Sequence, residues 1–175
     1  PHPMYKNVLD STSAEEIKQT MKHMGSNKTG GPSGILLEML KYLPDDVIDT
    51  FLVPFISEIL QGSDIPHDMK KFNVWCIEKE EGTGPVMHPE GKLKVRPISL
   101  FEVPVKLVEA IIAHRLHRAH GANPGHMSPM NFAFTPHKSV SDALLLHTLI
   151  MEDSAEYKKE IHISNNDCTQ AYDAA

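Results

Sequence analysis

The hydrophobic pattern changes its period at Phe72, and this change limits the possible folds more than any other feature of the chain. Two runs, "FNVWCIEK" and "KLKVRPISL", are apolar and bounded by polar residues, which is typical of β-strands. Residues 82–91 between them contain glycine and proline, so we expect an antiparallel hairpin with this segment as its loop. Pro97 lacks an amide hydrogen and should place the second strand at a sheet edge or end it locally.

The segments on both sides of the hairpin carry helical signals. Helices are expected at residues 11–24, 35–43, 45–62, 104–119 and 139–153. Ser13 should cap the first helix, with Glu16 as the matching carboxylate, and Ser139 or Ser141 should cap the last. Pro54 should kink the third helix or restart it.

Composition limits where a chain like this functions. The sequence has 175 residues, is 41% apolar, and contains no apolar run of roughly eighteen residues, so a membrane-spanning helix is not expected. It has two cysteines and no recognisable signal peptide, which predicts an intracellular location. The opening "PHPM" is typical of the remnant of an added tag.

The net charge of −6 is unevenly distributed along the chain. Residues 1–90 carry eight basic and fourteen acidic side chains, and residues 121–175 carry three and seven. Residues 91–120 carry six basic side chains against only Glu102 and Glu109. A basic stretch between two acidic ones indicates contact with an anion, or alternatively a solvated helix face.

Five stretches, read in order, resemble a reverse transcriptase of the type found in non-LTR retrotransposons and group II introns. The stretches are "NKTGGPSGI", "GSDIPHDMKKFNVWCIEK", "KLKVRPISLFEVPVKLVEAIIAHRL", "NFAFTPHKSVSDALLLHTLI" and "NDCTQAYDAA". "RPISL", followed at family spacing by D-x-x-x-A-Y-D, is the most specific part. The chain departs from the family pattern at Thr29, Gly30, Ser33, Asn131, Ala133, Thr135 and His137.

The resemblance implies an α+β fold. We expect a helix-rich fingers subdomain with an antiparallel β-hairpin, followed by the first palm strand of a right-hand polymerase fold. Residues 1–24 would form the N-terminal helix and its leader, residues 25–158 the fingers, and residues 159–175 the truncated start of the palm. Within the last segment, the alternating residues 160–167 predict the strand.

The first catalytic motif would lie at the end of that strand. Nucleotide transfer uses two Mg²⁺ ions about 4 Å apart, held by hard oxygen ligands. The resemblance implies that Asp167 is the catalytic Mg²⁺ ligand, that the backbone carbonyl of Cys168 is a further ligand, and that Asp173 is a structural acid. The alternative for Asp167 is a strand-end carboxylate that caps the following turn.

The resemblance also implies a nucleotide site. Arg96 would contact the triphosphate, helped by Lys79 or Lys94 from the same hairpin, because a guanidinium keeps its charge and presents a fixed fork of donors. Tyr172 would lie under the incoming sugar, or pack as a core aromatic. Arg96 has an alternative as well, an ion pair with an acidic residue of the hairpin. The candidate partners are Glu78, Glu80 and Glu81.

Five further basic residues are candidates for binding nucleic acid. They are Lys28, Lys106, Arg115, Arg118 and Lys138. Contacts from such side chains to phosphates would hold a duplex without reading its sequence, and would weaken with salt. Exposed basic residues on a helix are the alternative, and the turn at Lys28 could be a simple helix connector.

The expected function follows from the resemblance. The chain would be the N-terminal part of an RNA-directed DNA polymerase, with an RNA template, a DNA primer and dNTPs as partners and Mg²⁺ as cofactor. Family members complete the metal site with a later [FY]-x-D-D pair, which does not occur in this sequence. We therefore expect the chain on its own to be inactive, and the unpaired edge of residues 160–167 predicts a homodimer.

Two alternatives remain open from the sequence. The first is a catalytically dead, reverse-transcriptase-derived module that binds RNA or protein, which the replaced residues at 133–137 and the negative net charge favour. The second is a small metal-dependent hydrolase that uses Asp167 with His114, His117 and His120. It would need a second cluster of ligands, and surface or packing roles for these histidines are the simpler interpretation.

Overall fold

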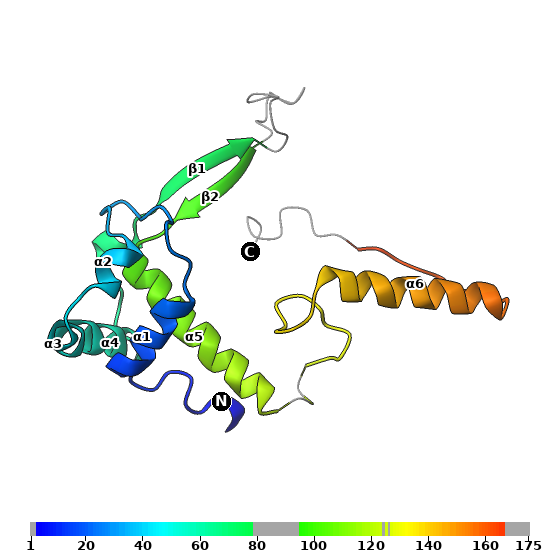
Figure 1. The fold of residues 1–175 in the computed structure, drawn as a ribbon, viewed down its shortest axis with the longest axis horizontal. Helices are drawn as coiled ribbons and strands as arrows, with labels where there is room; N and C mark the ends of the chain where they lie inside the picture. Colours follow the sequence, from blue (N-terminus) through cyan, green and yellow to red (C-terminus); the bar gives the residue numbers. More distant parts are fainter. Residues whose placement is uncertain (1–2, 79–94, 124, 126, 167–175) are drawn as a thin grey trace. The chain divides into compact units, whose positions relative to one another are not determined.

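A computed structural model describes residues 3–78, 95–123, 125 and 127–166. The chain divides into two compact units, residues 1–124 and residues 125–175, and each is described here by itself. The first unit combines several helices with a two-stranded antiparallel sheet, and the described part of the second contains one helix, α6 (Val140–Glu156), after an irregular loop (Figure 1). This composition confirms the α+β class at the level of element types.

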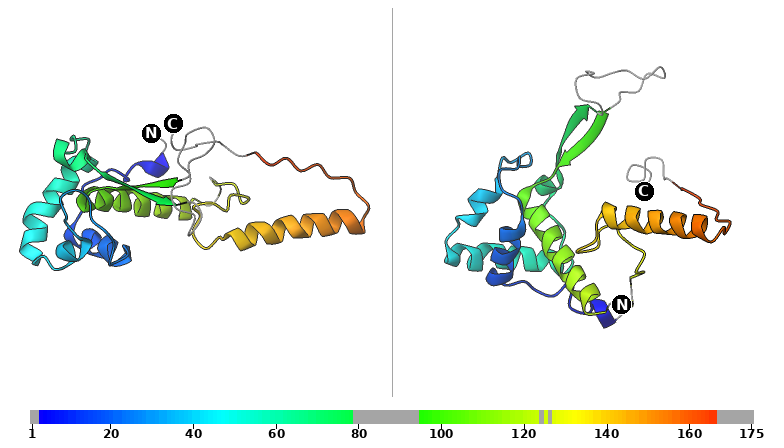
Figure 2. Two further views of the ribbon diagram at one scale, coloured as in Figure 1. Left: turned by 90° about the horizontal axis from the view of Figure 1, so that it is seen from above. Right: turned by 45° about the vertical axis from the view of Figure 1, so that its right-hand side comes forward.

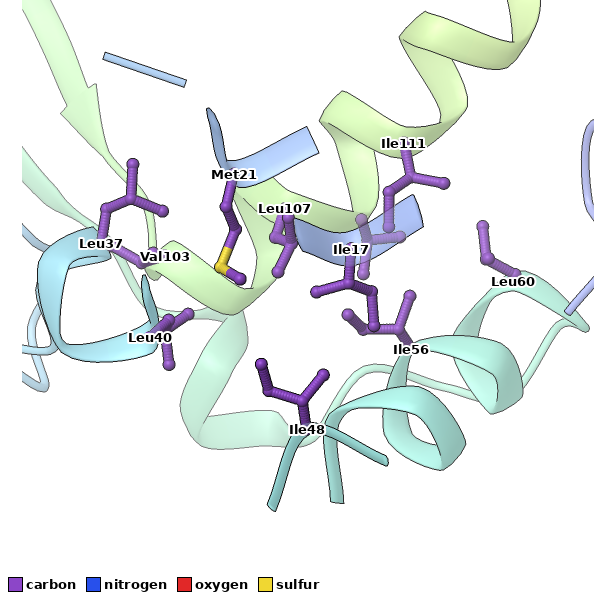
Figure 3. Close-up of a cluster of buried hydrophobic side chains, with 11 residues drawn as sticks. Ile17, Met21, Leu37, Leu40, Ile48, Ile56, Leu60, Val103, Leu107 and Ile111 are labelled. Atoms are coloured by element: carbon purple, nitrogen blue, oxygen red, sulfur yellow. The ribbon is translucent and has the colours of Figure 1, made fainter. Parts of the chain in front are cut away.

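Helices of the first unit surround one hydrophobic core. They are α1 (Ala14–His23), α2 (Leu37–Lys41), α3 (Asp45–Val47), α4 (Val53–Leu60) and α5 (Val103–Gly121), with 3-10 turns at Pro3–Tyr5 and His67–Lys70. The core side chains come from all of these helices except α3, and from the turn that follows α3 (Figure 3). Its fully buried members are Ile17, Ile48, Ile56, Leu107 and Ile111.

At the start of α1, the predicted cap is present but the predicted return contact from Glu16 is not. The Ser13 hydroxyl accepts a hydrogen bond from the Glu16 amide at 3.3 Å, so Ser13 is the cap. The Glu16 carboxylate does not return to the Ser13 backbone as a capping box would require. It accepts instead from the Thr12 hydroxyl at 2.9 Å and from arginine side chains of α5.

Pro54 restarts a helix, as predicted. A five-residue π-helical turn, Ile48–Leu52, separates α3 from α4, and Pro54 lies in the first turn of α4. A proline cannot donate to the carbonyl four residues earlier, and its ring crowds that carbonyl. The wider π turn occurs directly before the proline, where the regular hydrogen-bond ladder is interrupted.

The predicted hairpin is present. Strands β1 (Asn73–Glu78) and β2 (Val95–Leu100) pair antiparallel, with Trp75 opposite Ile98 and Ile77 opposite Arg96. Pro97 lies within β2 without ending it, because both strands of a two-stranded sheet are edges and need no donor on their outer side. The predicted loop, residues 82–91, lies outside the described residues.

The base of the hairpin is fixed against the start of α5 by an aromatic pair. The rings of Phe72 and Phe101 have their centroids 4.9 Å apart at an interplanar angle of 41°. From this base, the two strands extend away from the helices of the first unit (Figures 1 and 2). The hairpin therefore exposes both of its faces, and the aromatic pair joins its two strands at the base, just before α5.

The second unit contains α6 (Val140–Glu156), which begins with a complete capping box. Ser139 is the cap: its hydroxyl accepts from the Asp142 amide at 3.3 Å, and its amide donates to the Asp142 carboxylate at 2.7 Å. No residue of α6 is buried, and large apolar side chains such as Leu144 and Leu145 are exposed. None of the described helices is long and apolar enough to cross a membrane.

The predicted palm strand is not formed in the part of it that the structure describes. Residues 160–166 have no strand hydrogen bonding and are mostly exposed, and residue 167 lies outside the described residues. A strand is defined by the ladder that it makes with a neighbour, and alternation of side chains alone supplies no such neighbour. The expectation of a strand here was wrong for residues 160–166.

Candidate nucleic-acid-binding surface

Two lysines from distant parts of the first unit line one hollow. The hollow has a volume of about 240 Å³ and lies between the end of α1, the first turn of α2 and the start of α5. Lys28 and Lys106 line it together with Gly25 and Thr29. Neither ammonium group has a hydrogen-bond or ion-pair partner among the described residues. We call this feature the two-lysine hollow.

The turn that carries Lys28 is held by α2. Glu38 accepts a hydrogen bond from the Asn27 amide at 2.6 Å, and this bond is the main reason that the pKa of Glu38 lies below its ordinary value. Lys41 donates to the Met24 carbonyl at 3.3 Å. Asn27 has a φ of 56°, a left-handed conformation that asparagine adopts more readily than most residues.

A buried glutamate ties the next part of the loop to α5. Glu102, which is 3% exposed, accepts from the Ser33 amide at 2.8 Å and from the Ser33 hydroxyl at 2.5 Å. The carbonyl of Glu102 accepts from the Lys106 amide at 3.1 Å, at the first turn of the helix. Glu102 therefore joins the loop that follows Lys28 to the helix that carries Lys106.

Arg115 has a structural position. Its side chain is 9% exposed and donates to the Glu16 carboxylate twice, at 2.9 Å and 2.5 Å. Its remaining donors bind three backbone carbonyls, those of Val8 at 3.0 Å, Asp10 at 2.5 Å and Ser11 at 3.2 Å. A guanidinium with all of its donors used inside the chain has none left for a phosphate, so we leave Arg115 out of the surface.

Arg118 differs from its neighbour. Its side chain is 73% exposed, and its single contact to a carboxylate is to Glu16 at 3.2 Å. Exposed pairs of this kind contribute little to stability, because water and salt screen them. Arg118 therefore remains available for contacts with a partner.

Lys138 braces a loop of the second unit. Its ammonium group donates to the Pro129 carbonyl at 2.5 Å and to the Asn131 carbonyl at 3.0 Å, and it lies 5.0 Å from the centre of the Phe132 ring. These contacts hold residues 129–138 together. This bracing could not be predicted from the sequence, since all of the partners except the ring are backbone oxygens.

Arg96 is exposed on β2 and has no ion pair among the described residues, Glu78 included. The remaining members of the predicted nucleotide and metal sites lie outside the described residues. They are Lys79, Lys94, Asp167, Cys168 and Tyr172. Among the residues that the structure does describe, no three His, Cys, Asp or Glu side chains form a group that could hold a metal ion.

The histidines of α5 make contacts that the sequence did not indicate. The ring of His114 meets the ring of His23 on α1 edge to face, with centroids 5.6 Å apart. Burial is the main cause that lowers the pKa of His114, and the charges of His23, His117 and Arg118 act in the same direction. The arrangement favours a neutral imidazole at position 114.

Acidification is expected to destabilise the first unit through His114. Because the folded pKa lies below the ordinary value of 6.5, the unfolded chain takes up this proton first, and stability falls as the pH drops below about 6.5. His114→Gln should flatten the unfolding free energy between about pH 7 and pH 5 in urea titrations. His147→Gln, at an exposed position on α6, controls for the loss of a histidine. An unchanged slope in His114→Gln would contradict this role.

No protein-family model matches the chain. A function is inferred from the two-lysine hollow and, as separate positions that do not line it, from the exposed Arg96 on β2 and Arg118 near the end of α5.

Proposed function

We propose that the first unit binds the sugar–phosphate backbone of a nucleic acid. The observation that carries the proposal is the two-lysine hollow, which Lys28 and Lys106 both line without a carboxylate partner among the described residues. Lysine is a compact point charge that binds phosphate without demanding one orientation. Two positive charges that line one hollow both attract a bound phosphate.

We further propose that the chain is part of a reverse transcriptase. In this proposal, residues 25–158 are the fingers and residues 159–175 begin the palm of an RNA-directed DNA polymerase. Its partners are an RNA template, a DNA primer and dNTPs. The motif order "RPISL" to D-x-x-x-A-Y-D supports the assignment, as does an exposed Arg96 on an antiparallel hairpin that leads directly into α5.

Within the complete polymerase, the predicted site residues would bind the metal ion and the incoming nucleotide. Mg²⁺ would be held by Asp167 and the Cys168 carbonyl, and it supplies charge stabilisation for nucleotidyl transfer when bound. Arg96, with Lys79 or Lys94, would hold the triphosphate. Tyr172 would orient the sugar.

A second candidate function is a module that binds protein. The observation that favours it is α6, whose apolar side chains are exposed throughout the helix; those of Val140, Leu144, Leu145 and Leu149 are examples. A reverse-transcriptase-derived chain without catalysis could use such a helix for a partner or for a homodimer. The binding experiment below separates this candidate from the first.

Neutralising either lysine of the hollow should weaken binding to a labelled single-stranded RNA. Lys28→Gln and Lys106→Gln are each expected to lower affinity about threefold to tenfold near 50 mM salt, and to reduce the slope of log affinity against log salt by roughly 0.7. Fluorescence anisotropy at several salt concentrations measures both quantities.

Lys71→Gln is the matched control. It removes the same charge, but its ammonium group already pairs with Asp68 at 2.7 Å, so we expect an affinity within about twofold of the unaltered chain. Equal losses in all three variants would mean that only net charge matters, which contradicts a built site. No binding of RNA by the unaltered chain at low salt would reject this function and favour the protein-binding candidate.

A further inference from the structure

One face of the hairpin carries an exposed tryptophan beside an arginine. Side chains on a strand alternate between faces, and the pairs Trp75–Ile98 and Ile77–Arg96 are two residues apart along each strand. All four side chains therefore lie on the same face of the sheet. Val74, Ser99, Cys76 and Pro97 lie on the other face.

The side chain of Trp75 on this face is largely exposed to solvent. Its exposed fraction is 65%, and its ring makes no aromatic or cation–π contact with another described residue. The neighbouring Ile77 and Ile98 are 46% and 42% exposed. Arg96 is exposed on the same face without an ion pair among the described residues. The hairpin projects from the helices of the first unit (Figure 2). On it, the Trp75 ring lies beside exposed aliphatic side chains and the exposed Arg96 guanidinium.

We propose that Trp75 is a stacking platform for an unpaired base of a single-stranded nucleic acid, with Arg96 holding an adjacent phosphate. Every base has a flat π face, and stacking on an aromatic ring combined with backbone contacts by arginine is how proteins bind single strands without reading sequence. Ile77 and Ile98 support the edges of the ring across the two strands.

The positive charge of Arg96 indicates which kind of partner binds this face of the hairpin. A purely apolar partner would bury the Arg96 guanidinium without a counter-charge, which is costly. A nucleic acid supplies the π surface for Trp75 and the anion for Arg96 together. The inference rests on the proposed backbone binding and deepens it: the substrate has an unpaired strand at the hairpin, and Arg96 contacts that strand in place of the triphosphate assigned to it in the polymerase.

The sequence contains a single tryptophan, so its fluorescence reports on this position alone. The experiment titrates the whole chain with a single-stranded oligonucleotide, and with an abasic strand of equal length and charge. We expect strong quenching by the first and little by the second. The affinity for the base-containing strand, followed by anisotropy of a labelled strand, should fall about tenfold in Trp75→Leu. It should recover partly in Trp75→Phe.

Val74→Leu is the matched control, because this exposed side chain lies on the opposite face of the same strand. The affinity of this variant for the labelled strand should not change. Binding of the labelled strand without tryptophan quenching, and unaffected by Trp75→Leu, would overturn the platform while leaving backbone binding intact. Tryptophan emission that changes with protein concentration alone would also overturn it, since a second copy would then cover the face. No binding of either strand at low salt would reject both proposals.

Discussion

Replacing Arg115 with alanine is expected to lower the free energy of unfolding of the first unit by about 3–5 kcal/mol. The guanidinium is 9% exposed and is bonded to the Glu16 carboxylate through two nitrogens. Its removal leaves that carboxylate, which is 21% exposed, with only the Thr12 hydroxyl and the exposed Arg118 as donors, and it leaves the carbonyls of Val8, Asp10 and Ser11 without this donor. Breaking a largely buried pair from one side leaves a charge that the exposed Arg118 compensates only in part, and this costs much more than the loss of an exposed pair.

Arg118→Ala is the control for this experiment. It removes a cation from the same Glu16 and from the same helix, but its side chain is 73% exposed, so the loss should stay below about 1 kcal/mol. Urea denaturation followed by circular dichroism measures both variants. If the two variants lost equal stability, Arg115 would have no special structural role and would return to the set of candidate phosphate contacts.

The pH dependence supplies a second readout of the same contact. The hydrogen bond from Arg115 is the main cause that lowers the pKa of Glu16 below its ordinary value of 4.5. A group with a lowered folded pKa stabilises the fold above its unfolded value, and this contribution disappears as the pH falls through the folded value. In Arg115→Ala, the part of the acid sensitivity below about pH 4.5 that Glu16 causes should shrink.

Signals that act within a few residues were enough to predict most elements. Ser13 and Ser139 cap their helices, the proline at 54 restarts a helix, and the two strands pair as an antiparallel hairpin. In each case, the determining side chain and the backbone that it affects are neighbours in the sequence. Caps, proline and hydrophobic period need no knowledge of the tertiary fold.

Contacts between distant residues could not be predicted in the same way. Glu16 was assigned to a local capping box, but its carboxylate meets Arg115, which is 99 residues further along the chain. Basic residues on α5 all looked alike in the sequence, and only their position on the helix separates the buried Arg115 from the exposed Arg118. The strand prediction for residues 160–166 was wrong for a related reason. A strand needs a neighbouring strand to pair with, and the sequence of one segment does not specify that neighbour.

Ser33 shows how a single polar side chain can join a loop to a helix. The resemblance places an aspartate there, and the serine was read only as a difference. In the structure, the serine hydroxyl and amide both donate to the buried carboxylate of Glu102. An aspartate would face that carboxylate with a second negative charge, so the serine and the glutamate form a matched pair that joins the loop to α5.

Gly31→Ala should destabilise the first unit by about 1–3 kcal/mol and weaken RNA binding by at least as much as Lys28→Gln. A Cβ at this position would lie 2.8 Å from both the Cα and the backbone nitrogen of Glu102, and 2.9 Å from its Cδ. The backbone of Glu102 cannot shift without a loss of stability, because Glu102 directly precedes α5 and is 3% exposed. The loop must therefore move away from the helix, and it carries Lys28 with it.

Gly121→Ala separates this steric effect from the general effect of replacing a glycine. A Cβ at Gly121 meets no atom within 4 Å, so the substitution at the end of α5 should leave stability unchanged or slightly raised. Urea denaturation and anisotropy with labelled RNA are measured on both variants. A Gly31→Ala chain that loses stability yet binds RNA with unaltered affinity would show that the 30–33 loop supports the fold without positioning Lys28. A loss of both places the lysine of the hollow under the control of the contact between the loop and Glu102.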